Sequence, residues 1–330
     1  MSKHSLPNLS VRVAMAILSV FAFLAGGQAH AQAYPNHAIR ILAGFPAGGP
    51  TDIAMRAMAQ SASKTLGHPV IVENVPGAGG AVSIVRLKNA SADGYTLGML
   101  TLGVFRSPVM EDVGYDPIKD LTYIIRLTNL QFGIVVRSES PWKMWQDFIV
   151  GARANPDKIS YGVAAGLGNS AHLLMEEVSA RDGLRLTVVP YKGSADVAQA
   201  LMGGHIALSS DSSGGFGTLV ESGKARLLAV ASERRSPRWK DIPTLQELGY
   251  NVAVDSPWGI GGPKGMDPAT VRIVHDAFRK ALEDAAVLKV LDQFGQGLRY
   301  MNPEEYTRYA VQAAQEERAM LTKYGFAKKQ

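Results

Sequence analysis

Cysteine is absent from all 330 residues of the chain. This absence excludes a disulfide framework, thiolate metal ligands, a redox dithiol and a membrane anchor through a lipidated cysteine. Long apolar runs are scarce as well. The longest, Val13 to Ala25, is shorter than the roughly 20 residues that a membrane-spanning helix requires.

That apolar run is typical of a secretory signal. Lys3 and Arg12 precede it and supply positive charge, and Ala29, His30 and Ala31 follow it as an A-x-A cleavage site. We therefore predict a signal peptide over residues 1–31, export to the periplasm, and a soluble mature chain that begins near Gln32.

Concentrated positive charge is also missing. The net charge is +5, and the basic residues are scattered apart from short clusters such as Arg234 to Arg238, so a nucleic-acid partner is not expected. The seven histidines are widely spaced, and neither H-E-x-x-H nor G-x-S-x-G occurs. We predict no metal and no cofactor, while a catalytic triad assembled from distant residues stays open.

Short β-branched runs alternate with stretches of helical period, which predicts an α/β fold with a largely parallel sheet. The predicted strands are Ile39–Ala43, Val70–Glu73, Thr96–Leu100, Tyr123–Leu127, Ile134–Arg137, Ile159–Val163, Leu186–Val189, Ile206–Ser209, Leu227–Ala231, Ala253–Ile260 and one near Arg299. The predicted helices are Thr51–Leu66, Ala81–Asn89, Pro141–Ala154, Ser170–Ala180, Ser194–Met202, Phe216–Ser222, Thr244–Leu248, Asp267–Asp284 and Pro303–Tyr324.

Three glycine turns stand between a predicted strand and a predicted helix. They are GFPAGGPTD (44–52), ENVPGAGGAV (73–82) and YGVAAGLGNSAH (161–172). In open α/β sheets ligands bind at the carboxyl ends of strands, where helix amides attract anions and glycine allows close approach of the backbone. Few basic residues surround these turns, so we expect backbone amides to hold the acid group of the ligand.

Side chains in these turns allow two interpretations. Thr51 and Ser170 are either helix N-caps or ligand contacts. Asp52 is either a partner of the helix dipole or the holder of a water or a ligand amine, and His172 is either a buried, hydrogen-bonded ring or a ligand group. The related motif GLGNSA (166–171) fits a dinucleotide fingerprint only in part, since Lys192 stands where the ribose-binding acid is needed.

Several blocks carry a resemblance to a known family. They are YPNHAIRILAGFPAGGPTD, LGHPVIVENVPGAGG, ADGYTL, YDPIKDL, VPYKGSADVAQALMGGHIAL, SGKARLLAVAS, DIPTLQELGY and NPEEYTRY, in this order, across Tyr34 to Gly325. The chain resembles the substrate-binding proteins of tripartite tricarboxylate transporters, the Bug or TctC-like proteins. The resemblance implies a type II periplasmic binding fold, in which two α/β lobes are joined by two crossing strands and grip a ligand in the cleft. Lobe 1 would comprise residues 32–131 and 253–330, and lobe 2 residues 132–252.

The resemblance also implies the site. Position by position it nominates Phe45, Ala47, Gly48, Thr51 and Asp52 from the first turn, Ala78 and Gly79 from the second, and Gly168, Ser170 and His172 from the third, with Thr101 and Asp211 as further candidates. One departure is Arg106, which stands in a stretch that is usually neutral.

The implied function is capture of a di- or tricarboxylate, an acidic amino acid or an aromatic carboxylate by a monomer that delivers it to membrane permease subunits. Two alternatives stay open. One is a sensor subunit that presents its ligand to a membrane receptor, and the other is an exported enzyme acting on a carboxylate.

Overall fold

Two β-sheets carry the fold. The computed structural model describes residues 34–254 and 256–328. Contacts divide the chain into two units, residues 1–36 and residues 37–330, and both sheets belong to the second unit. The predicted signal peptide lies outside the described residues. None of the described helices combines the length and the apolar composition that crossing a bilayer requires.

The first sheet has six strands in the order β11-β4-β10-β3-β1-β2. Its strands are β1 (Ile39–Ala43), β2 (Val70–Asn74), β3 (Thr96–Thr101), β4 (Leu121–Leu130), β10 (Ser256–Pro263) and β11 (Gln296–Met301). β1 is parallel to β2 and β3, whereas β10 is antiparallel to β3 and β4. The sheet is therefore mixed, not largely parallel as predicted, because the chain leaves it through β4 and re-enters it through β10.

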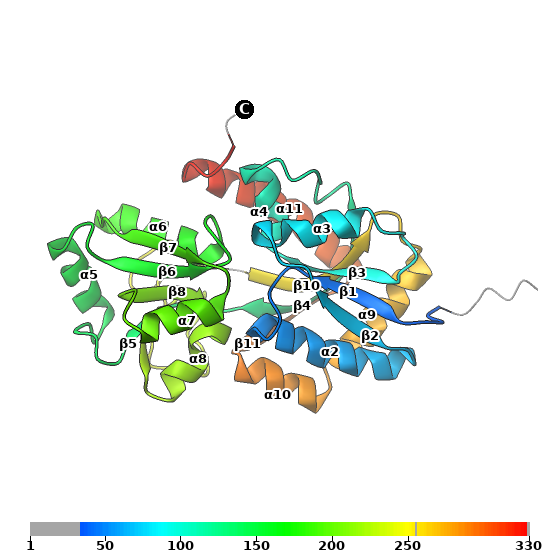
Figure 1. Cartoon of the computed structure of the whole chain (residues 1–330), viewed down its shortest axis with the longest axis horizontal. Helices are drawn as coiled ribbons and strands as arrows, with labels where there is room; N and C mark the ends of the chain where they lie inside the picture. Colours follow the sequence, from blue (N-terminus) through cyan, green and yellow to red (C-terminus); the bar gives the residue numbers. More distant parts are fainter. Residues whose placement is uncertain (1–33, 255, 329–330) are drawn as a thin grey trace, which may run out of the picture. The chain divides into compact units, whose positions relative to one another are not determined.

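The second sheet has five strands in the order β7-β6-β8-β5-β9. Its strands are β5 (Phe132–Arg137), β6 (Ser160–Ala164), β7 (Thr187–Tyr191), β8 (Leu208–Ser212) and β9 (Ala225–Val230). β6 is parallel to β7 and β8, and β5 is antiparallel to β8 and β9. Figure 1 shows this sheet in green, beside the first.

Helices cover both faces of each sheet. They are α2 (Pro50–Leu66), α3 (Ala81–Lys88), α4 (Gly103–Met110), α5 (Trp145–Ala154), α6 (Ser170–Asp182), α7 (Ser194–Met202), α8 (Ser213–Glu221), α9 (Pro268–Ala281), α10 (Ala285–Gln293), α11 (Pro303–Lys323) and the short 3-10 helix η1 (Ala78–Gly80). α5 and α6 share a core on one face of the second sheet, and α7 and α8 share a core on the other. On the first sheet α3, α4 and α11 share one core, and α2 packs against α9 (Figure 1). We call the first sheet with its helices lobe 1 and the second lobe 2.

The lobes are joined where β4 ends at Leu130 and β5 begins at Phe132, so Gln131 alone separates the two strands. The returning chain runs beside this crossing. The Ala231 amide donates to the Phe132 carbonyl at 2.9 Å, and the Val254 amide donates to the Ala231 carbonyl at 2.7 Å. The two crossings therefore support each other, and the residue boundaries of the lobes stay a prediction.

The sequence pattern predicts neither α10 nor α4. In α4, Pro108 has no amide hydrogen to give to the carbonyl of Val104, which normally disfavours a helix interior. The hydroxyl of Tyr115 donates to that carbonyl at 3.0 Å instead, and Val104, Phe105 and Val109 are buried. Packing and a hydrogen bond from outside the helix therefore stabilise a segment that its own residues disfavour.

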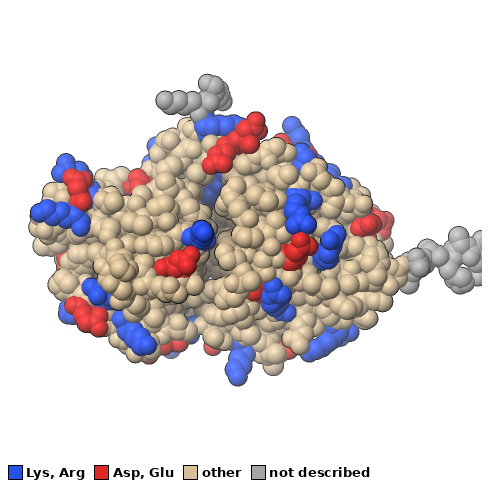
Figure 2. Space-filling view, viewed as in Figure 1, with Lys and Arg blue, Asp and Glu red and all other residues tan. Residues whose placement is uncertain are grey.

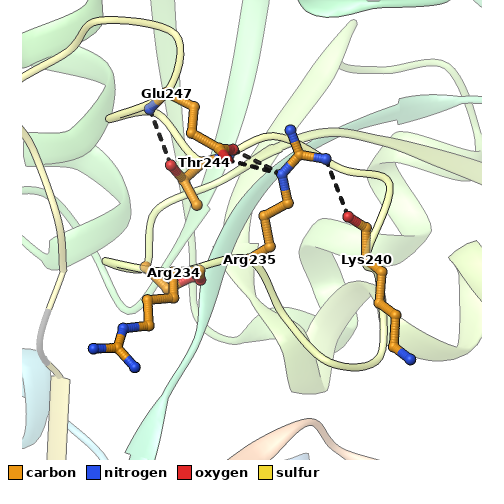
Figure 3. A network of polar contacts seen from close by, with 6 residues as sticks. Arg234, Arg235, Lys240, Thr244 and Glu247 are labelled. Atoms are coloured by element: carbon orange, nitrogen blue, oxygen red, sulfur yellow. Dashed lines mark hydrogen bonds and ion pairs between the residues drawn. The ribbon is translucent and has the colours of Figure 1, made fainter.

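The predicted helix Thr244–Leu248 is wrong, because the segment forms a single turn. The Thr244 amide donates to the Glu247 carboxylate at 2.8 Å, the Glu247 amide donates to the Thr244 hydroxyl at 3.0 Å, and Gly249 ends the turn at φ 86°. Arg235 Nε lies 2.9 and 3.0 Å from the two Glu247 carboxylate oxygens (Figure 3). Side-chain contacts therefore close this turn and neutralise part of the basic cluster.

Candidate functional site

Two adjoining cavities lie where loops of both lobes meet. The helix-end cavity, about 350 Å³, is lined by the starts of α2, α6 and α7, and the glycine-loop cavity, about 520 Å³, is lined in part by residues 76–80. Both are lined by Phe45, Pro46 and Ala165. Figure 2 shows a hollow between the lobes, with charged side chains at its rim.

Three helices begin at the helix-end cavity. The first amides of a helix have no partner within it. The carbonyls of Gly49, Asn169 and Gly193 accept the first intrahelical bonds of α2, α6 and α7. Among the described residues the amides left without an acceptor are those of Thr51 and Asp52 in α2, Ser170 and Ala171 in α6, and Ser194 and Ala195 in α7, and all of these residues line the cavity. Converging amides at the positive ends of helix dipoles favour an anion.

The caps of these helices differ from the prediction. Gly49 and Gly193 cap α2 and α7 and provide no side-chain hydrogen bond, while Asn169 caps α6 by accepting the His172 amide at 3.0 Å. The N-cap interpretation of Thr51 and Ser170 is therefore wrong. Since two of the three starts lack a capping side chain, a ligand can occupy that place.

Both carboxylate oxygens of Asp52 accept hydrogen bonds from groups of the protein itself. Asp52 is 3% exposed, and it accepts hydrogen bonds from the Gly48 amide at 2.9 Å, Arg56 Nε at 3.0 Å and Asn74 Nδ2 at 2.7 Å. Burial alone would raise the pKa of this carboxyl group. The hydrogen bonds together lower the pKa by more than burial raises it, so the pKa lies below its ordinary value. Asp52 thus holds the first glycine turn in place as a paired anion.

Arg106, from α4, is the only basic side chain that lines the helix-end cavity within the described residues. It is 5% exposed, and its Nε and Nη2 lie 2.5 and 3.1 Å from the two carboxylate oxygens of Glu317 in α11. Its Nη1 donates to the Ser170 hydroxyl across the lobes at 2.9 Å. The guanidinium charge is therefore balanced within the protein, and the amides remain the main anion-binding groups.

Asp211, in β8, also lines the helix-end cavity and is 4% exposed. The Ser212 amide and the Ser194 hydroxyl donate to its Oδ1 at 2.7 and 2.9 Å. Burial raises its pKa to about 6, although these hydrogen bonds lower it in part. The cavity thus contains a buried acid whose pKa lies above the ordinary value of an aspartate.

The glycine-loop cavity is shaped by backbone in the left-handed region. Ala78, Gly79 and Gly80 have φ of 45°, 60° and 99°. A Cβ on Gly44 would lie 2.7 Å from the Gly80 Cα, so the first two glycine turns pack backbone to backbone. In the part of the chain that the structure describes, Lys192 of lobe 2 is the only basic side chain that lines this cavity.

The nominated residues divide into three groups. The helix-end cavity is lined by Phe45, Ala47, Gly48, Thr51, Asp52, Thr101, Ser170 and Asp211. The glycine-loop cavity is lined by Phe45, Ala78 and Gly79. Gly168 and His172 line neither of the two cavities.

His172 lies behind the third glycine turn. Its ring is 3% exposed, and its Nδ1 accepts the Gly168 amide at 2.9 Å. Burial lowers its pKa, which favours the neutral ring that this bond requires. The ring also packs edge-on against Phe326, with centroids 4.9 Å apart. Of the two interpretations of His172, the structure therefore supports the buried, hydrogen-bonded ring and not the ligand group.

The site residues that the family resemblance implies do not include a fourth turn that lines the cavities. Lys192, Ser194 and Asp196 line the cavities and follow β7. Its signal is present in the sequence as VPYKGSAD, where Gly193 separates a strand from a helix. Among the described residues no three His, Asp or Glu side chains gather to hold a metal ion.

A family model and several related proteins match most of the chain. The family model of the tripartite tricarboxylate transporter family receptor, TctC, matches residues 54–326. A Cupriavidus necator protein of the gbd 5' region is 41% identical over 328 residues, which is 99% of each chain. The Bordetella pertussis protein BugT is 31% identical over 284 residues, covering 83% of this chain and 86% of BugT.

Solved structures agree with this fold. The periplasmic binding protein BugD is 29% identical, with a TM-score of 0.83 over 90% of this chain and 100% of BugD. A Rhodopseudomonas palustris protein solved with adipate is 27% identical, with a TM-score of 0.83 over 89% and 99% of the two chains. MatC of the same organism, solved with bound malate, is 25% identical, with a TM-score of 0.79 over 87% and 100%. Since sequence and fold agree over most of its length, the chain belongs to the tripartite tricarboxylate transporter receptor family of two-lobed periplasmic binding proteins.

Proposed function

We propose that the chain is a periplasmic solute-binding protein that captures a small organic carboxylate and delivers it to the permease subunits of a tripartite tricarboxylate transporter. The observation that supports this most directly is the convergence of free amides from α2, α6 and α7 on one cavity, whose only lining basic side chain among the described residues is already paired. Adipate and malate, held by two related proteins, are the first ligands to test.

Capture requires the lobes to close. The amides come from α2 in lobe 1 and from α6 and α7 in lobe 2, so a ligand that contacts both lobes binds the closed state more tightly than the open one. Residues 32–131 with 253–330 and residues 132–252 would move as rigid bodies about the two crossings, in a monomer.

Ionisable side chains that are already paired within the protein are consistent with ligand binding without catalysis. Asp52 and Arg106 line the cavity and His172 lies behind the third glycine turn, and each of the three has a hydrogen-bond partner within the protein. We expect a thermal-shift screen of the exported chain against adipate, malate and aromatic carboxylates to find stabilising ligands. Mass spectrometry should then recover each compound unchanged, and conversion to a product would favour the enzyme alternative.

A proline at the start of α7 tests whether the Ser194 amide binds the carboxylate of the ligand. Ser194 is the first residue of α7, where proline is tolerated because its amide has no helical partner. Ser194→Pro removes the amide and the hydroxyl, whereas Ser194→Ala removes the hydroxyl alone. Since a hydrogen bond to a charged group contributes about 1.5–3 kcal/mol, we expect Ser194→Pro to bind the carboxylate at least roughly tenfold more weakly than Ser194→Ala by calorimetry. Equal affinities in two folded variants would contradict amide capture at α7.

A further inference from the structure

An arginine of lobe 2 caps the end of a helix that belongs to lobe 1. Helix α10 ends at Gln293, and the last carbonyls of a helix have no donor within it. Nη1 of Arg238 donates to the Asp292 and Gln293 carbonyls at 2.5 and 3.0 Å. A cation at this end of a helix is also favoured by the helix dipole. One guanidinium of lobe 2 therefore stabilises the end of α10 in lobe 1.

Glu221 holds this guanidinium on lobe 2. Nε of Arg238 donates to the Glu221 carboxylate at 2.5 Å, and Nη2 is paired with the same oxygen. The guanidinium carbon also lies 5.3 Å from the centre of the Trp239 ring. Because these contacts lie within lobe 2, they fix the guanidinium independently of lobe 1. Its bonds to α10 then depend on how close the two lobes are.

Ser213, at the start of α8, extends the contact to the crossing strands. Its hydroxyl donates to the Phe294 carbonyl at 2.7 Å and lies 3.1 Å from the Gly295 carbonyl. Its amide donates to the carbonyl of Gln131, at the crossing, at 2.7 Å. Figure 1 shows α8 beside α10. We call the contacts of Arg238 and Ser213 with the carbonyls of residues 292–295 the α10 clasp.

The two lobes approach closely at glycines beside the clasp. A Cβ on Gly214, in α8, would lie 2.6 Å from the Cβ of Pro50, at the start of α2 in lobe 1. A Cβ on Gly295 would lie 2.9 Å from the Cβ of Ser213. Both distances are too short for a side chain, so the lobes are closed on each other along this edge.

We propose that the α10 clasp holds the lobes closed and thereby sets the affinity of the carboxylate site, although neither Arg238 nor Ser213 lines the two cavities. The inference rests on the proposed function, because it assigns to the clasp the closure that capture of the ligand requires. When only the closed state binds, the apparent Kd is the intrinsic Kd divided by the closed fraction. Bonds that favour closure therefore raise the affinity without contacting the ligand.

A double variant tests the clasp in the ligand-free protein. Arg238→Met with Ser213→Ala removes both donors and keeps most of the apolar volume. Small-angle X-ray scattering of the full exported chain should give a larger radius of gyration for this variant than for the wild type. Arg235→Met is the matched control and should leave the radius unchanged, because Arg235 contacts Glu247 and the Lys240 carbonyl within lobe 2. Equal radii for the folded double variant and the wild type would overturn the inference.

Gly214→Ala tests closure without removing a hydrogen bond. Alanine is favoured inside α8, but its Cβ would meet Pro50 only when the lobes are closed. The ligand-free radius of gyration should therefore increase again. Gly217→Ala is the control in the same helix, where a Cβ would meet Trp239 at an ordinary 3.6 Å, and it should leave the radius unchanged. If the double variant does not fold, an unchanged radius for Gly214→Ala still contradicts the inference.

Calorimetry with adipate and malate connects the clasp to the ligand. We expect the double variant to bind them at least roughly fivefold more weakly than the wild type, while Arg235→Met binds as the wild type does. Equal affinities of the double variant and the wild type would show that the clasp does not set the affinity. If neither compound nor any aromatic carboxylate binds to the wild type, the proposed function fails, whereas the ligand-free scattering still decides whether the clasp closes the lobes.

Discussion

Replacement of Glu317 by glutamine is expected to lower the free energy of unfolding by roughly 3–5 kcal/mol, because it leaves the Arg106 guanidinium buried without its counter-charge. Both residues are 5% exposed, and Arg106 Nε lies 2.5 Å from the nearer carboxylate oxygen. The amide of glutamine keeps the volume of the side chain, so the loss reflects charge more than packing. Denaturant unfolding of the two proteins at pH 7.5 measures it.

The exposed pair Arg279–Glu283 provides the control. Its side chains are 43% and 66% exposed and 3.0 Å apart, so Glu283→Gln should cost about 0.5 kcal/mol or less. The double variant Arg106→Met with Glu317→Met should recover most of the stability, since well-packed apolar residues often replace a buried ion pair at little cost. A loss for Glu317→Gln no larger than for Glu283→Gln would show that water screens the Arg106–Glu317 pair.

Replacement of Asp211 by asparagine is expected to stabilise the protein at neutral pH by up to about 3 kcal/mol. Burial raises the pKa of Asp211 to about 6, and each pKa unit corresponds to about 1.4 kcal/mol. The folded protein therefore holds the proton more tightly than the unfolded chain. The contribution of Asp211 is most favourable below about pH 4, and it is lost as the pH rises to about 6.

Thermal and denaturant unfolding of wild type and Asp211→Asn at pH 4 and pH 7.5 test this sign. The variant should gain stability at pH 7.5 and little or none at pH 4. The control Asp241→Asn, at an exposed aspartate, should follow the wild type at both pH values. A variant less stable than wild type at pH 7.5 would mean that contacts favour the ionised carboxylate. A gain would mean that the cavity retains a costly acid, as expected of a residue kept for binding.

The sequence anticipated the features that are written locally. Strands β1, β2 and β3 appear where β-branched runs predict them, and the glycine turns at residues 44–52 and 73–82 follow β1 and β2. Glycine and proline between a strand and a helix determine backbone geometry over a few residues, so a local pattern is sufficient. The resemblance then supplied the two-lobed fold, which comparison with known structures confirms.

Partners remote in sequence were decided by the tertiary structure alone. Arg106 meets Glu317 from 211 residues away, and the Tyr115 hydroxyl completes α4 at the carbonyl that Pro108 leaves free. His172 faces the Gly168 amide instead of the cavity, which the identity of the residue does not reveal.

By itself, then, the sequence determined where the chain turns and exposes its amides, because glycine and helix starts act within one or two turns. The tertiary structure decided which charges are neutralised and that Asp211 is buried in the cavity wall, because hydrogen bonding and desolvation depend on segments that meet only when the chain folds.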